Sequence, residues 1–72
     1  MSRQLEETNK FTERINKIIE VLEETKVKAE VRLYVPKNVD SFVASINAKK
    51  HNCKIGAVLT NNGTDELIIR RK

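Results

Sequence analysis

The chain has 72 residues, of which 39% are hydrophobic and 33% charged, and its formal net charge is +4. This length permits one domain, residues 1–72, whose small core buries about 60% of the surface that the unfolded chain would expose. A lone cysteine excludes an internal disulfide, and no apolar run approaches the roughly 20 residues that span a bilayer. The polar N-terminus shows no secretory signal, so we expect a cytoplasmic protein without a membrane partner.

Residues 3–25 are predicted to form the first helix, with Ser2 as its N-cap. Their apolar side chains recur at steps of three and four, which places them on one stripe: Phe11, Ile15, Ile18, Ile19 and Leu22. Before Phe11 only Leu5 is apolar. That end therefore extends past the domain, frays or meets a partner, and a homodimer contact there is one hypothesis.

Residues 26–35 alternate strictly between apolar and polar side chains, which predicts a strand with one wet face. The buried set is Val27, Ala29, Val31, Leu33 and Val35, and the exposed set is Lys26, Lys28, Glu30, Arg32 and Tyr34. Pro36 ends the strand because it has no N–H for the ladder.

Residues 39–51 are predicted to form a second helix, with Asn38 as its N-cap and Asn52 as its stop. Its expected buried stripe consists of Val39, Phe42, Val43 and Ile46.

Residues 54–71 are predicted to form a hairpin around a three-residue loop, Asn61-Asn62-Gly63, which pairs Thr60 with Thr64. This register places the apolar set on one face, because a slip of one residue would reverse the faces of a strand: Ile55, Ala57, Leu59, Leu67 and Ile69.

The expected fold is a two-layer α+β domain of order α-β-α-β-β, with two helices on one face of a three-stranded, mainly antiparallel sheet. We place the last strand in the centre, antiparallel to both neighbours.

The other face of the predicted sheet carries Tyr34, Val58 and Ile68 beside Arg32 and Arg70. An apolar cluster rimmed by arginines is typical of a surface that recognises a protein or a nucleic acid. The alternative is that strand propensity alone placed these residues on a wet face.

Charge is divided unevenly along the chain. Residues 1–26 carry a net charge of −1, whereas residues 27–72 carry nine basic and four acidic residues, a net +5. Such basic clusters can contact phosphates, although a solvated helix end and a basic tail are the alternative. The candidate phosphate contacts are Arg32, Lys49, Lys50, Lys54, Arg70, Arg71 and Lys72.

His51 and Cys53 form a His-x-Cys pair, but zinc needs four ligands and the chain has no other histidine or cysteine. The sequence also lacks a glycine-rich phosphate loop and a partner for His51 in nucleophilic catalysis. We therefore expect no metal, no cofactor, no catalytic residue and no small-molecule substrate.

These patterns favour a small non-catalytic binding or regulatory protein, with a nucleic acid duplex as the leading partner. The alternative is an accessory or inhibitor protein, of the kind that phage and mobile-element genes encode, which binds a larger protein complex. It would use Tyr34, Val58 and Ile68, or an exposed sheet edge.

Overall fold

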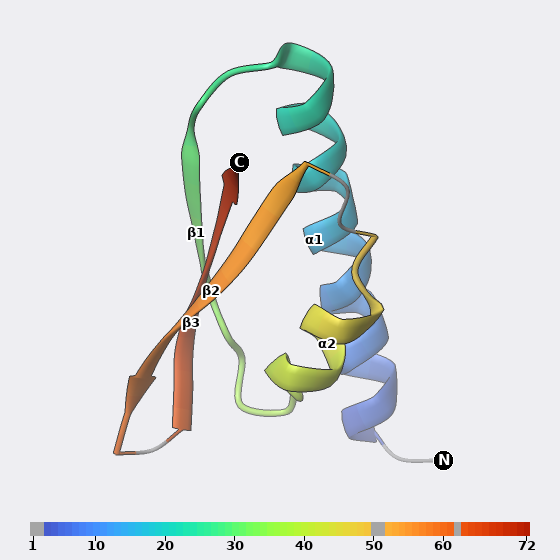
Figure 1. Ribbon diagram of the computed structural model, residues 1–72. Coiled ribbons are helices and arrows are strands. Elements are labelled where there is room, and N and C mark those ends of the chain that lie inside the picture. The colour runs from blue at the N-terminus through green and yellow to red at the C-terminus, as the bar shows by residue number, and fades with distance from the viewer. Residues whose placement is uncertain (1–2, 50–51, 62) are drawn as a thin grey trace.

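The computed structural model describes residues 3–49, 52–61 and 63–72, so Ser2, Lys50, His51 and Asn62 lie outside it. The elements are, in chain order, α1 (Arg3–Thr25), β1 (Glu30–Tyr34), α2 (Ser41–Asn47), β2 (Cys53–Thr60) and β3 (Gly63–Arg71). Figure 1 shows the helices on one side of the sheet, which confirms the predicted α+β class. Among the described residues, no helix is long and apolar enough to cross a membrane.

The strand order is β1-β3-β2, and β3 lies antiparallel to both neighbours. The predicted central position of the last strand is therefore confirmed. Two apolar rows cross the sheet on the side of the helices, Val31–Ile69–Ile55 and Leu33–Leu67–Ala57. The core forms where the stripe of α1 packs on these rows: Phe11, Ile15, Ile19 and Leu22 are buried together with Leu33, Leu67 and Ile69.

The body of the hairpin has the predicted register, but its turn differs. Thr60 pairs with Gly63 and Leu59 with Thr64, so the predicted pairing of Thr60 with Thr64 is wrong. The extra residue is Asp65, where the register shifts, and its carbonyl accepts a hydrogen bond of 2.8 Å from the backbone N–H of Val35. The Val35 N–H, just after β1, thus provides a hydrogen-bond partner for the carbonyl of the unpaired Asp65. The pattern of residues within the hairpin does not reveal this contact.

Helix α2 is shorter than predicted and turned about its axis. Its N-cap is Asp40, and not Asn38, because the Asp40 carboxylate accepts hydrogen bonds from the N–H groups of Phe42 and Val43, each 3.1 Å long. Phe42 is 74% exposed and Ile46 is also exposed, so their predicted burial is wrong. Ala44 and Ala48 are buried instead. Because α2 packs chiefly against α1, small side chains at this contact let the two backbones approach closely.

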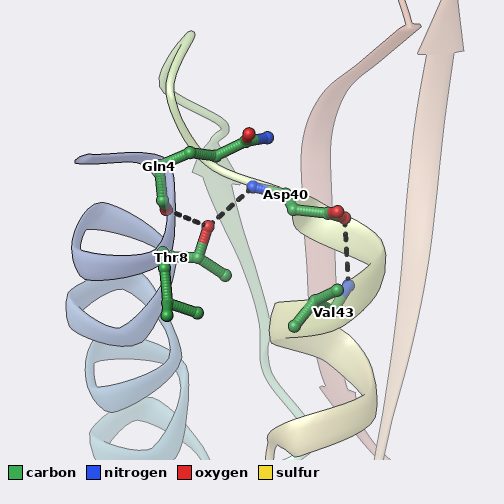
Figure 2. A pocket seen from close by; sticks show the side chains of 5 residues that line it. Gln4, Thr8, Asp40 and Val43 are labelled. Carbon is green, nitrogen blue, oxygen red and sulfur yellow. Dashed lines mark hydrogen bonds between the residues drawn. The ribbon is translucent and has the colours of Figure 1, made fainter. Parts of the chain in front are cut away.

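Two polar side chains of α1 hold the two ends of α2. The buried Thr8 hydroxyl donates to the Gln4 carbonyl at 2.6 Å and accepts from the Asp40 N–H at 2.9 Å (Figure 2). At the other end, the Lys49 N–H donates to the Asn16 side-chain oxygen at 2.8 Å. Neither contact is visible in the apolar pattern of α1.

The start of α1 does not stand free of the domain. Leu5, which is half exposed, lines a hollow of about 180 Å³ with Gln4, Thr8, Asp40 and Val43 (Figure 2). The sequence alone did not identify what this end of α1 contacts. In the structure it lies beside the start of α2.

Besides Phe42 and Ile46, three more apolar residues assigned to the core are exposed. Val27 precedes β1, which is shorter than the predicted strand, and Ala57 and Leu59 lie toward the hairpin turn. Figure 1 shows this end of the hairpin projecting away from α1. The predicted face of Ala57 and Leu59 is confirmed by their register, but their burial is wrong, because this part of the sheet extends beyond the described helices.

Candidate functional site

The outer face of the sheet, opposite the helices, is the candidate site. Its residues form three rows, each crossing β1, β3 and β2 in that order. Side chains alternate between faces along each strand, so all nine residues point away from the helical layer. The rows are Glu30–Arg70–Lys54, Arg32–Ile68–Gly56 and Tyr34–Glu66–Val58.

The strand order concentrates basic charge at one end of this face. Because β3 runs antiparallel to both neighbours, its last residues lie beside the first residues of β1 and β2. Arg70 therefore lies directly between Glu30 and Lys54. Arg32 follows on β1, where its Nη2 atom is 3.8 Å from the Glu30 Oε2 atom. This end of the face therefore has three basic side chains, Arg32, Lys54 and Arg70, beside one acidic side chain, Glu30, and its net charge is positive.

The structure divides the candidate phosphate contacts into two sets. Arg32, Lys54 and Arg70 share the outer face. Arg71 lies on the other face, opposite the buried Cys53, and Lys49 lies in the helical layer beside Asn16. Lys72 follows the end of β3, where its N–H donates to the Asn52 carbonyl at 2.7 Å. Arg70 and Arg71 are adjacent in one strand, so the alternation of side chains places them on opposite faces of the sheet. This separation could have been predicted from the sequence.

The turn end of the hairpin has the opposite charge. Residues 57–69 contain Asp65 and Glu66 and no lysine or arginine. Lys54 and Arg70 pair at the other end of the same two strands. The hairpin is therefore basic at one end and acidic at the other. The comparison of residues 1–26 with residues 27–72 did not show this, because both ends of the hairpin lie in the second range.

A hollow of about 320 Å³ opens over Gly56 on the outer face. A Cβ atom added to Gly56 would meet no atom within 4 Å, so the surface is open at this residue. Ile68, Lys54, Arg70 and Glu30 are among the residues that line it. An apolar floor with two cations at its rim can accept an anionic or amphipathic group.

The three apolar residues predicted for protein binding share the outer face but do not lie in one row. Tyr34 is 81% exposed on β1, and Val58 is half-buried on β2. Glu66 separates these two residues, while Ile68 lies in the next row on the central strand. The apolar surface is thus interrupted by a carboxylate.

Cys53 is buried in the core, where it begins β2. Burial raises the pKa of its thiol above the ordinary value, and Glu23 raises it further, whereas Arg71 and Lys72 act in the opposite direction. Within residues 3–49, 52–61 and 63–72, no group of three or more histidine, cysteine, aspartate or glutamate side chains can hold a metal ion. The His51 half of the predicted His-x-Cys pair lies outside the described residues.

The raised pKa of Cys53 predicts a loss of stability in alkaline solution. The folded chain holds the thiol proton more tightly than the unfolded chain, so protonation of Cys53 contributes to the free energy of unfolding. This contribution is complete below the pKa of the unfolded chain, about 8.5, and is lost as the pH rises through the pKa of the folded chain. We expect the urea midpoint to fall above about pH 8.5 and Cys53→Ala to reduce that fall. An unchanged alkaline slope in Cys53→Ala would contradict this assignment.

Comparison with family models, with curated proteins and with solved structures finds no match to this chain.

Proposed function

We propose that this protein binds the backbone of a nucleic acid duplex through the basic end of its outer sheet face. The observation that carries the proposal is the placement of Arg32, Lys54 and Arg70 on one face of the sheet, opposite the side on which α1 and α2 lie. Phosphate contacts from lysine and arginine supply most of the affinity of sequence-independent binding.

The distribution of acidic residues supports an approach from this side of the molecule. Helix α1 carries Glu20, Glu23 and Glu24 in its last two turns, within the opposite layer. A polyanion is repelled by that layer and attracted to the outer face, so the charge distribution orients the encounter. Tyr34 is the only aromatic residue on the outer face, because Phe11 is buried and the exposed Phe42 lies on α2 in the helical layer. This face therefore offers one aromatic side chain for stacking, which favours a duplex over a single strand.

The salt dependence of binding tests this function. Three phosphate contacts predict that the logarithm of the association constant falls with the logarithm of salt concentration with a slope of about −2.7. Lys54→Ala and Arg70→Ala should each weaken binding to any duplex sequence and reduce the magnitude of the slope by about 0.9. Fluorescence anisotropy with short random-sequence DNA and RNA duplexes, from about 50 to about 200 mM salt, gives both quantities.

Lys17→Ala is the matched control, because Lys17 is an exposed lysine on α1. It should leave the affinity and the slope close to those of the unmodified chain. Absence of binding at about 50 mM salt would refute the proposal. Equal effects of Lys17→Ala and Lys54→Ala would also refute it, because binding would then follow net charge alone.

A second candidate function is binding to a larger protein complex, as an accessory or inhibitor. The 81% exposure of Tyr34 and the position of Ile68 at the floor of the hollow favour it. An apolar contact weakens little with salt, whereas phosphate contacts weaken steeply. Ile68→Asp should then abolish a complex isolated from nuclease-treated host extract, while Lys54→Ala should leave it intact. Circular dichroism checks that Ile68→Asp remains folded.

A further inference from the structure

The free edge of β2 is the feature that the proposed function does not use. In the order β1-β3-β2, this strand of eight residues has β3 on one side and no strand on the other among the described residues. Long edge strands with few charges are templates for pairing with another chain. Lys54 is the only charged residue of β2, whereas the shorter β1, at the opposite edge, carries Glu30 and Arg32.

The same strand also carries uncovered apolar side chains on its inner face. Leu59 is 72% exposed, and Ala57 is exposed beside it, although both lie on the face that elsewhere forms the core. An occupant that adds a strand to this edge would cover both the open edge and these side chains.

We propose that the occupant is a second copy of this chain, whose β2 pairs antiparallel with the first β2 around a twofold axis at Ala57. Residues 54–60 of the two copies then lie opposite one another, with Leu59 beside the Ile55 of the second copy and Val58 beside its Gly56. Shifting the axis to Gly56 would instead place two glycines at the centre, where no side chains meet. The register at Ala57 therefore buries more apolar surface.

Charge complementarity favours a second copy over a different protein. The hairpin is basic at Lys54 and Arg70 and acidic at Asp65 and Glu66, near the turn. Antiparallel pairing directs the basic end of one copy toward the acidic end of the other, whose Asp65 and Glu66 lie on β3, one strand behind the contact. Lys54 then faces the uncharged Thr60, and the two lysines lie far apart on opposite sides of the axis. A surface that complements itself in this way is what a twofold dimer requires.

Such pairing forms a continuous six-stranded sheet and leaves the outer face open, so it does not depend on nucleic acid binding. The contact lies at the small end of protein interfaces, below about 1,200 Å². We therefore expect a dimer that forms reversibly in the range of about 1 µM to about 100 µM protein.

Analytical ultracentrifugation of the full chain without nucleic acid tests the proposal. The unmodified chain should convert from monomer to dimer between about 1 µM and about 100 µM. Ala57→Lys and Ala57→Glu each place like charges on the twofold axis, and each should weaken the dimer by at least about tenfold. An equimolar mixture of the two variants should restore association, because the axis then joins a lysine to a glutamate.

Val21→Lys is the control, since Val21 is an exposed apolar residue of α1 on the side of β1. It should leave the dimer unchanged. A chain that remains monomeric at about 1 mM would overturn the proposal, as would an Ala57→Lys variant that still dimerises or a mixture that does not associate. If Ala57→Lys fails to fold, Leu59→Lys changes an exposed neighbour on the same face and must disrupt the dimer in the same way.

Discussion

Leu67→Ala is expected to lower the free energy of unfolding by about 2–5 kcal/mol, the largest effect that we predict for a single substitution. Leu67 is 1% exposed in the central strand, between Leu33 and Ala57. Removing its side chain leaves a cavity under α1 that the paired strands cannot close. A domain of this size has a total stability of only about 5–15 kcal/mol, so the variant should be partly unfolded at room temperature or melt far below the unmodified chain.

Leu59→Ala is the matched control for this substitution. Both leucines lie on the inner face of the hairpin, but Leu59 is 72% exposed. Its replacement should change the free energy of unfolding of the monomer by no more than about 0.5 kcal/mol. Urea denaturation at low protein concentration, where the proposed dimer is absent, measures both variants. Equal losses for the two leucines would mean that the turn end of the hairpin is covered.

Thr8→Val is expected to lower the free energy of unfolding by about 1–3 kcal/mol. Valine matches the shape of threonine, but it cannot accept the hydrogen bond of 2.9 Å that the Asp40 N–H donates. That N–H is left without its partner at the start of α2, where it is only partly exposed. An unsatisfied donor costs more than the bond itself contributed, because water does not replace the lost acceptor fully. Hydrogen exchange should show faster exchange of the Phe42 and Val43 amides, which depend on the position of Asp40.

Thr12→Val tests whether this effect comes from the contact between the helices. The Thr12 hydroxyl is also buried, but it donates only to the Thr8 carbonyl of its own helix, at 2.9 Å. That carbonyl keeps its place in the helical ladder when the hydroxyl is removed, so no donor on α2 loses a partner. The stability of Thr12→Val should therefore stay close to that of the unmodified chain. A loss as large as that of Thr8→Val would contradict the assignment of the Thr8 effect to its hydrogen bond with Asp40.

Long periodic segments made most of this fold predictable. The stripe from Phe11 to Leu22 identified the buried face of α1, and the alternation around Val31 and Leu33 identified the inner face of β1. In the hairpin, only one register aligned the apolar residues, so the pairing of Ile55 with Ile69 followed from the sequence. These predictions succeeded because each depends only on the regular spacing of apolar residues within one helix or strand, and each of these elements packs against a broad apolar surface.

The outer face was predictable as a set of residues and, in large part, as a charge distribution. Alternation placed Arg32, Tyr34, Val58 and Ile68 on one side of the sheet. The alternation also separates Arg70 from Arg71, and the concentration of charge at one end follows from the alternation together with the predicted strand order. The position of Lys49 beside Asn16 required the tertiary structure, because it depends on a contact with α1.

The sequence by itself determined the element types, the faces of the long helix and the strands, and the register in the body of the hairpin, because side-chain periods of 3.6 and 2 are properties of one chain segment. Tertiary structure decided the rotation of α2. Seven residues are too few to define one stripe, so contact with α1 selected Ala44 and left Phe42 exposed. It also decided that Leu59 is exposed and that the Asp65 carbonyl accepts a hydrogen bond from the Val35 N–H. Both depend on which other segments of the chain pack against these residues.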